Sequence, residues 1–310
     1  MSVSDQDTKI NPEKTKIKKV RPRKKFELYN FIVSFVLGFF ALIIILPFYY
    51  VIIISITSEA EFIRTPLLIF PTEPTLDAYR ALFADGRIFI GYGATLRILA
   101  IGLPVNMILT TLLAYALSRP AFPGKKFFIF YALFTMFFSG GIIPLYLLIV
   151  ELGIINTIWS VVLASGINTF YFILMRNYFM ALPPSLEESA KIDGAHELRV
   201  LISIILPISK PILATITLFY AVDRWNEWFN ALVFIRRMDL TPLQLILRAM
   251  VMEAMIQDPA ATAAIDDIVV QFALGMRMAA VFLTMLPVML VYPFLQKYFT
   301  KGIMIGAIKA

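Results

Sequence analysis

The feature that most constrains this chain is a series of long stretches without a charged residue. Five such stretches occur, at Leu28–Ile56, Ile98–Ser118, Phe127–Val150, Leu152–Met175 and Met278–Gln296. Each is long enough to cross roughly 30 Å of hydrocarbon as an α-helix that rises about 1.5 Å per residue. Pro211–Ile235 is a sixth candidate, although it carries Asp223, Arg224 and Glu227. The sequence therefore predicts an all-α integral membrane protein with six transmembrane helices.

The composition excludes several other classes of protein. Hydrophobic residues make up 59% of the chain and charged residues 16%, against about 45–50% and about 25% in soluble domains. A soluble enzyme and a disordered protein are both excluded, because neither could hide or tolerate so much apolar surface. The chain has no cysteine and one histidine. We therefore expect no catalytic residues and no metal site, and we predict that the chain is not an enzyme.

The distribution of basic residues predicts the orientation in the membrane. Six spans put both termini on the same side, and that side holds nineteen Lys and Arg residues against six on the other. Lys-rich and Arg-rich loops remain in the cytoplasm, so both termini are predicted to be cytoplasmic. The expected domains are a basic arm over residues 1–27 and a six-span transmembrane domain over residues 28–310, whose cytoplasmic tail is 297–310. The outer segments Thr57–Ile90 and Arg236–Gln271 are expected to be irregular, with short helices.

One cytoplasmic loop carries most of the functional information. It covers residues 183–210, between the fourth and fifth spans, and reads PPSLEESAKIDGAHELRVLISIILPISK. Ser185 stands where an N-cap is expected, and Glu188 completes a capping box with it. The pattern predicts a short helix over Glu187–Asp193, a turn at Gly194 and a second short helix over Ala195–Ile205 that ends before Pro207. Two short helices joined by this turn would form a docking surface, and the small residues Ser189 and Ala190 would permit the close approach of a partner.

The spacing of this loop resembles the EAA motif of bacterial ABC importer permeases, E-A-A-x3-G-x9-I-x-L-P. Here the motif reads Glu188-Ser189-Ala190, then Gly194, then Ile204-Ile205-Leu206-Pro207, with Ser in place of the first Ala. In that family the loop is the coupling helix, which docks into a cleft on the ATP-hydrolysing subunit. The resemblance implies an ATPase-coupling role for Glu187, Glu188, Ser189, Ala190, Asp193, Gly194, Ala195, Ile204, Leu206 and Pro207.

The resemblance extends over Thr95–Ala310. FYAVDRWNEWFNALVFI is similar to the fifth span of carbohydrate-type permeases, and QKYFTKGIMIGAIKA is similar to their C-terminus. The chain thus resembles the maltose-type family of ABC importer permeases, and within it the subgroup for complex or acidic oligosaccharides. The implied architecture is that of a type I ABC importer permease.

The sequence contains no G-x-x-x-x-G-K-[ST] phosphate loop, so it cannot power transport alone. No cofactor is expected on this chain, and ATP with Mg²⁺ is expected on a separate ATPase subunit. The resemblance implies two ATP-binding subunits, a second homologous permease that completes a heterodimer, and an extracytoplasmic solute-binding protein that delivers an oligosaccharide. The implied location is the bacterial cell membrane, and no nucleic acid is expected as a partner.

The predicted fifth span holds a polar and aromatic cluster that could contact a sugar. Its members are Asp223, Trp225, Asn226, Glu227, Trp228 and Asn230. On a continuous helix with about 100° per residue, four polar residues would share one face: Asp223, Asn226, Glu227 and Asn230. Arg224 and Trp228 would form a neighbouring i, i+4 pair. Amides and carboxylates pair with hydroxyl groups, and aromatic rings stack on sugar faces. The alternative is structural: Asp223 or Glu227 pairs with Arg224 and holds helices together.

A second interruption lies in the predicted third span. Ser139-Gly140-Gly141, followed by Pro144, is expected to break the helix. Such breaks are tolerated where the backbone lines a cavity or packs on protein. Gly140 and Gly141 are therefore also candidates for the substrate pathway.

Two alternative functions remain open at this point. One is an ABC permease for another solute, such as a polyamine or a peptide. The other is an ion-driven secondary transporter, which hydropathy alone allows but which has no need of a coupling loop. The motifs in the fifth span and the tail favour the carbohydrate permease.

Overall fold

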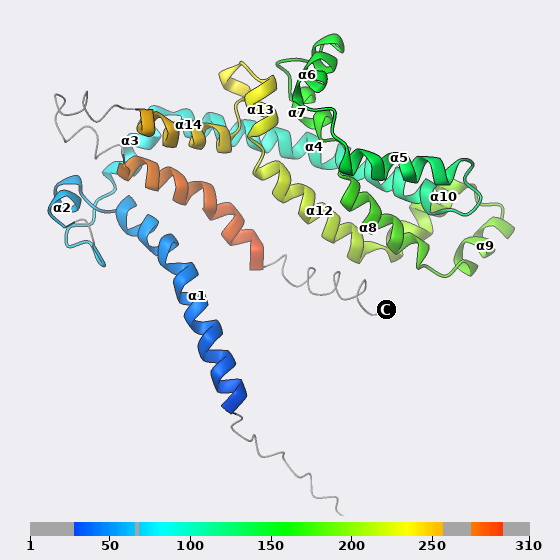
Figure 1. The fold of residues 1–310 in the computed structure, drawn as a ribbon, viewed down its shortest axis with the longest axis horizontal. Coiled ribbons are helices and arrows are strands. Elements are labelled where there is room, and N and C mark those ends of the chain that lie inside the picture. The colour runs from blue at the N-terminus through cyan, green and yellow to red at the C-terminus, as the bar shows by residue number, and fades with distance from the viewer. Residues whose placement is uncertain (1–27, 66–67, 257–273, 294–310) are drawn as a thin grey trace, which may run out of the picture. The chain divides into compact units, whose positions relative to one another are not determined.

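The computed structural model describes residues 28–65, 68–256 and 274–293 (Figure 1). The chain divides into two compact units, residues 1–48 and 49–310. The predicted basic arm at 1–27 and the predicted tail at 297–310 lie outside the described residues. Within the described ranges every regular element is a helix, and the sole β-type pairing is an isolated bridge between Thr57 and Pro74. The all-α prediction is therefore confirmed.

The described part of the first unit is a single apolar helix. It forms the first turns of α1 (Leu28–Ser55), which continues into the second unit. Its side chains are apolar all round and exposed over residues 29–48 almost throughout. A helix with exposed and almost wholly apolar side chains suits a lipid environment. The predicted first span is thus a continuous helix of 28 residues.

The long helix α4 (Arg87–Ser118) is the axis of the second unit. Figure 1 shows α14 (Leu243–Ile256) beside its first half, and α8 (Thr169–Met180) and α12 (Lys210–Trp225) beside its second half. Gly91 permits the close approach of α14, since a Cβ there would lie 2.9 Å from the Cα of Leu243. The helix begins eleven residues before the predicted start at Ile98, because Gly86 with φ 75° ends α3 (Asp77–Asp85) and starts α4.

Three of the expected spans are bent pairs of helices. α5 (Lys125–Phe137) meets α6 (Ile142–Glu151) at 117°, α7 (Ile158–Ala164) meets α8 at 58°, and the segment Glu197–Ile208 meets α12 at 86°. Among the described residues three helices are long and apolar enough to cross a membrane, or six if each bent pair is one span. The predicted break at Gly140 and Gly141 is confirmed, with Gly141 at φ 85°.

Two predicted spans were wrong in their boundaries or their continuity. The fourth was placed at Leu152–Met175, but residues 152–157 form a turn in which Gly153 and Asn156 have left-handed backbone. The fifth was expected to be continuous over Pro211–Ile235, but α12 ends at Trp225 and the chain resumes as α13 (Phe229–Phe234). Hydropathy averages over a window, so it does not detect breaks of three or four residues inside an apolar stretch.

The two outer segments also contain short helices. α2 (Glu59–Arg64) and α3 lie in the first, as expected, and the 3-10 helix η2 (Met238–Leu240) lies in the second. α14 in the second segment is longer than the short helix expected. It buries Leu243, Ile246 and Met250 in a core shared with α4 and with the helix Leu274–Pro293.

Candidate functional site

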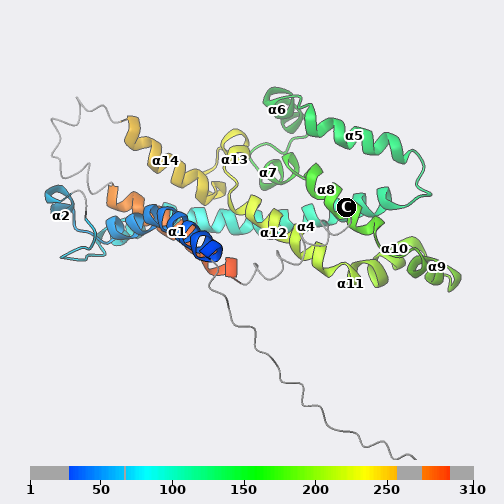
Figure 2. The same ribbon diagram turned by 60° about the horizontal axis from the view of Figure 1, so that its bottom comes forward.

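The loop at 183–210 folds into consecutive short helices at one end of the bundle (Figure 2). They are α9 (Ser185–Ile192), α10 (Glu197–Val200), the π-helix η1 (Leu201–Ile205) and α11 (Leu206–Ile208). Gly194 has φ 80°, which an L side chain rarely adopts. Its N–H donates to the Lys191 carbonyl at 3.0 Å, and the Ala195 N–H donates to the Ala190 carbonyl at 2.9 Å. This pair of bonds is a Schellman motif, so the predicted turn at Gly194 is confirmed.

Two details of the predicted loop were wrong. Ser185 is the first residue of α9 rather than its N-cap, and no side chain caps that end. Pro184, held near helical φ by its ring, takes the N-cap position one residue earlier. The second helix runs past Pro207, which occupies the first turn of α11, where a missing N–H costs little. The bend falls at Ser209 instead, between α11 and α12.

The residues of the EAA motif divide between two faces of α9. Glu188, Ser189 and Asp193 are exposed, together with Ile192, an apolar side chain that is 86% exposed. Glu187 and Ala190 are buried against the chain itself, and Ala195, Ile204 and Leu206 pack around the same apolar core. Ala190 therefore does not offer close approach to a partner, as the sequence had indicated; it joins a core that includes Val200, Leu201 and Ile205.

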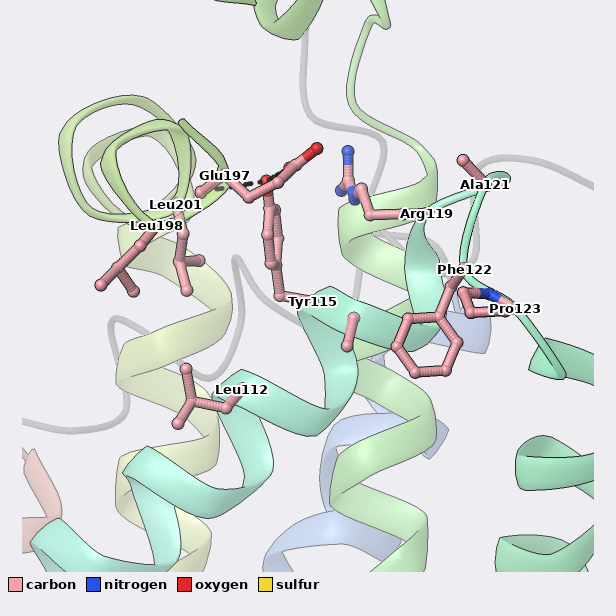
Figure 3. Close-up of a pocket in the computed structure, with 10 residues that line it drawn as sticks. Leu112, Tyr115, Arg119, Ala121, Phe122, Pro123, Glu197, Leu198 and Leu201 are labelled. Atoms are coloured by element: carbon pink, nitrogen blue, oxygen red, sulfur yellow. Dashed lines mark hydrogen bonds between the residues drawn. The ribbon is translucent and has the colours of Figure 1, made fainter. Parts of the chain in front are cut away.

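The end of α4 contacts α9 and α10 of this loop through polar side chains, and Figure 3 shows the contact with α10. Arg119, which follows α4, forms an ion pair with Glu187 of α9. The Tyr115 hydroxyl donates to Oε2 of Glu197 in α10 at 2.8 Å. The Arg119 guanidinium lies over the Tyr115 ring, 4.7 Å from its centroid, which is a cation–π contact. Lys191 of α9 forms an ion pair with Glu197 at 2.6 Å and so links α9 to α10. We call these five residues the clamp.

Electrostatics within the clamp are nearly balanced. Two cations, Arg119 and Lys191, face two carboxylates, Glu187 and Glu197. Burial lowers the pKa of the Arg119 guanidinium, while Tyr115 and Glu197 act in the opposite direction. An arginine remains charged under such shifts, so the clamp holds a permanent cation beside Glu187.

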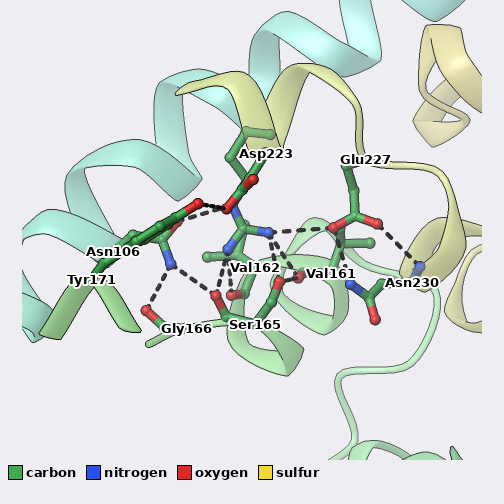
Figure 4. A network of polar contacts seen from close by, with 10 residues as sticks. Asn106, Val161, Val162, Ser165, Gly166, Tyr171, Asp223, Glu227 and Asn230 are labelled. Carbon is green, nitrogen blue, oxygen red and sulfur yellow. Dashed lines mark hydrogen bonds and ion pairs between the residues drawn. The ribbon is translucent and has the colours of Figure 1, made fainter. Parts of the chain in front are cut away.

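A polar knot lies farther along the bundle, around Arg224 of α12 (Figure 4). Arg224 is 2% exposed. Its Nε donates to Oδ1 of Asn106 at 2.9 Å, and its Nη atoms donate to the carbonyls of Val161, Val162 and Ser165 and to Oγ of Ser165 at 2.9–3.2 Å. Oε2 of Glu227 lies 3.6 Å from Nη1. All five N–H donors of the guanidinium are thereby used.

The position of this cation follows from the break between α7 and α8. The last carbonyls of a helix have no partner within it, and that end carries partial negative charge. Val161 and Val162 lie in the last turn of α7, and Ser165 follows it. Arg224 therefore caps α7 from a different helix. Gly102 of α4 makes room, since a Cβ there would lie 3.0 Å from the Arg224 Nε.

Other members of the predicted sugar cluster have separate partners. Glu227 accepts from the backbone N–H and the Nδ2 of Asn230, at 3.1 and 3.0 Å. The Tyr171 hydroxyl donates to Oδ2 of Asp223 at 3.0 Å. Asp223, Arg224, Glu227 and Asn230 line a cavity of about 210 Å³ together with Ser165, Ile167, Asn168 and Tyr220. The structure thus brings Asp223, Glu227 and Asn230 to one cavity.

The predicted common face was wrong for Asn226, and the predicted pairing of Arg224 with Trp228 was wrong as well. α12 ends at Trp225, so Asn226 departs from the helical face and its Oδ1 accepts from Gln244 at 3.2 Å. Trp225 is buried beside Tyr92 of α4. Trp228 pairs with Arg248, whose guanidinium lies 4.0 Å from the ring centroid, rather than with Arg224. Gly140 and Gly141 have no other atoms within 4 Å of a built Cβ, so the break stands in open space in this chain.

Sequence reasoning missed Tyr115, Arg119, Gly102, Ser165 and Tyr171. Arg119 was counted only as a topology signal, although a basic residue directly after a long apolar helix can form an ion pair with a carboxylate on a neighbouring loop. The small pair Ser165-Gly166 inside the fourth apolar stretch resembles the Gly140-Gly141 break and offered the same signal. Nothing in the sequence marked the pairing of Arg119 with Glu187, because 68 positions separate them.

Comparison with known proteins identifies close relatives. The chain is 40% identical to Protein LplC of Bacillus subtilis over 277 residues, which is 88% of this chain and 92% of that protein. It is 38% identical to the polygalacturonan/rhamnogalacturonan transport system permease protein YtcP of the same organism, over 92% of this chain and 99% of the relative. No family model matches the chain.

A solved structure has the same fold. A chain of a bacterial ABC transporter involved in the import of the acidic polysaccharide alginate superposes with a TM-score of 0.79 and 31% sequence identity. The match covers 89% of this chain and 98% of that chain.

Proposed function

Because the chain belongs to the permease subunits of ABC sugar importers, we propose that it forms one half of the translocation pathway of an ATP-driven oligosaccharide importer. The observation that carries this proposal is the similarity over nearly the whole length to a permease named for polygalacturonan and rhamnogalacturonan transport, joined to the fold of an alginate importer. Both names denote acidic polysaccharides, so an acidic oligosaccharide is the first substrate class to test.

The assembly follows from the family and from the missing phosphate loop. A second, homologous permease completes the pathway, two ATP-binding subunits carry ATP and Mg²⁺, and a solute-binding protein delivers the sugar. The six-span chain lies in the bacterial cell membrane with both termini in the cytoplasm, as the excess of basic residues on that side supports. The permease itself catalyses no reaction.

Coupling takes place at the exposed face of α9. Glu188, Ser189 and Asp193 supply polar contacts to an ATPase cleft, and the isolated apolar side chain of Ile192 supplies an anchor that water would otherwise surround. ATP binding draws the two ATPase subunits together and displaces α9. The helices then rock and expose the pathway outward, and hydrolysis resets them.

The small polar cavity beside the knot is the proposed place of sugar contact. Asp223 and Asn226 are exposed in this chain, and Glu227 and Asn230 lie at intermediate depth. Carboxylate and amide groups are suited to hydroxyl groups, and Trp228 offers a partly exposed ring. Arg224 has no free donor for a substrate and serves the framework, while Trp225 is buried and Gly140 and Gly141 allow the break in the third span.

Co-purification and transport test the function. The tagged chain, expressed with its neighbouring genes, should bring down an ATPase and a second permease. In proteoliposomes the complex should hydrolyse ATP faster when its binding protein is loaded with labelled oligogalacturonides, alginate oligosaccharides or maltodextrins, and it should take up the stimulating sugar. Isolation without an ATPase, or uptake driven by an ion gradient without ATP, would contradict the proposal.

The sugar-contact assignment has a separate test. Asn226→Ala and Asp223→Asn should change the dependence of uptake on sugar concentration while the amount of assembled complex stays constant. Tyr131→Phe, an exposed residue on α5, is the control. Normal uptake with unchanged concentration dependence in both variants would refute the contact role without touching the family assignment.

A further inference from the structure

The coupling loop is joined to the helix core by few backbone neighbours. α9 packs beside α10, and α10 beside η1, while α4 packs mainly with α8, α12 and α14. Two polar links join α4 to the loop, Arg119 to Glu187 of α9 and Tyr115 to Glu197 of α10. They stand beside an apolar core in which Leu117 of α4 is buried with Ala190 and Val200 of the loop. A displacement of α9 therefore has a defined route into α4 through two side chains.

A cavity beside the clamp leaves space into which α10 can move. It has a volume of about 530 Å³ and lies between the end of α4, the turn at residues 121–123 and α10 with η1 (Figure 3). Leu112 of α4 and Leu198 and Leu201 of the loop line it. Because packed apolar side chains resist relative motion and a cavity does not, α10 has room to shift here while the Tyr115 hydroxyl keeps hold of Glu197.

We propose that Tyr115 and Arg119 are positioning residues that transmit the displacement of the coupling loop to α4. The inference rests on the proposed function, since it needs an ATPase that moves α9. Arg119 holds α9 through Glu187, and Tyr115 holds α10 through Glu197. The cation–π contact between them, together with Lys191–Glu197, makes the two links one unit. α4 then carries the motion to α8 and α12, on which it packs.

The absence of cysteine from the chain permits a direct test. A single Val222→Cys reporter, at an exposed position in the last turn of α12, is introduced into the full chain and purified with its partner subunits in proteoliposomes. The probe is a membrane-impermeant maleimide, and its rate of reaction is measured with and without ATP, Mg²⁺ and vanadate. ATP hydrolysis is measured on the same samples. We expect trapping to change the maleimide rate in the parent protein, because α12 moves with α4.

Tyr115→Phe and Glu197→Gln should each reduce the nucleotide-dependent change in maleimide rate by about three- to tenfold, which is the range for the net contribution of one hydrogen bond at a partly exposed position. The double variant should be no worse than the stronger single variant, because both changes act on the same contact: phenylalanine removes the donor, and glutamine removes the charge that strengthens the bond. Tyr131→Phe and Glu151→Gln make the same chemical changes at exposed positions and should leave the response intact. Arg119→Lys should fall between parent and Tyr115→Phe, since lysine keeps the charge but lacks the planar fork.

The outcomes separate the two proposals. A full nucleotide response in Tyr115→Phe and in the double variant overturns the positioning role. A loss of response in exact proportion to a loss of ATP hydrolysis per complex also overturns it, because a merely structural role lowers both together. A parent protein that purifies without an ATPase and shows no response to nucleotide instead refutes the proposed function.

Discussion

Two arginines, both next to α4, are held in different ways. Arg224 is almost inaccessible and uses all five donors on fixed groups of α4, α7 and the turn after α7. Arg119 is more accessible, with a side chain that is 15% exposed, and it pairs with a carboxylate on a short helix. The first joins elements that act as a framework. The second joins a framework helix to a loop that we propose to move. Both cations have an acidic partner, so the difference between them lies in how completely protein groups surround each guanidinium.

The largest effect is expected from Arg224→Ala. It leaves the carbonyls at the end of α7 and the carboxylate of Glu227 without their cation, and breaking a buried pair costs about 3–5 kcal/mol. The purified variant should unfold at a much lower temperature in detergent and should lose assembled complex. Arg80→Ala removes an arginine whose ion pair is largely exposed and should change the free energy of unfolding by less than about 1 kcal/mol. Equal stability of the two variants would show that the knot is not a framework.

Gly102→Ala tests the same knot without removing a charge. The new methyl group would meet the Arg224 Nε at 3.0 Å, and overpacking of this kind costs about 1–3 kcal/mol. Gly93→Ala is the matched control on the same helix, where the nearest atom lies at 3.6 Å on the flexible end of Arg97. That control should be neutral or stabilising by up to about 1 kcal/mol, because alanine favours helix. Thermal unfolding of both variants compares their stabilities. A Gly102→Ala variant as stable as the parent would contradict the close packing of Arg224 against Gly102.

The loop should respond through coupling rather than through global stability. In Gly194→Leu the new Cβ has no described atom within 4 Å, but the φ of 80° costs an L residue about 1–2 kcal/mol. We expect insertion and assembly to persist while sugar uptake per ATP hydrolysed falls. Gly194→Asn should recover most of the coupling, since asparagine tolerates left-handed backbone. Full coupling in Gly194→Leu would refute the role of the turn.

The smallest effect is expected at the outer edge of the clamp. Lys191 and Glu197 are both about half exposed, so Lys191→Met should alter stability by no more than about 1 kcal/mol and less at high salt. Its influence on uptake should be smaller than that of Tyr115→Phe. A larger effect for Lys191→Met than for Tyr115→Phe would place the transmitting contact between α9 and α10 instead of at α4.

The sequence by itself determined the features that depend on residues close together along the chain. Hydropathy over twenty-residue windows indicates a membrane protein, because lipid requires apolar side chains along a whole helix. Gly194 and the spacing around it predicted the turn and the coupling loop, since a left-handed position and an EAA motif occupy only a few consecutive residues. The identity of the family followed from the same short patterns.

Only the tertiary structure decided how the polar residues inside those helices are used. Arg224 caps a helix that ends 60 positions earlier in the sequence, and Glu187 pairs with Arg119 from another loop. In a soluble helix, apolar periodicity would have shown which face is buried. In a chain that is apolar toward both lipid and protein, that periodicity carries little information. The breaks that create unpaired carbonyls, and the distant cations that satisfy them, therefore become visible only when the helices are packed.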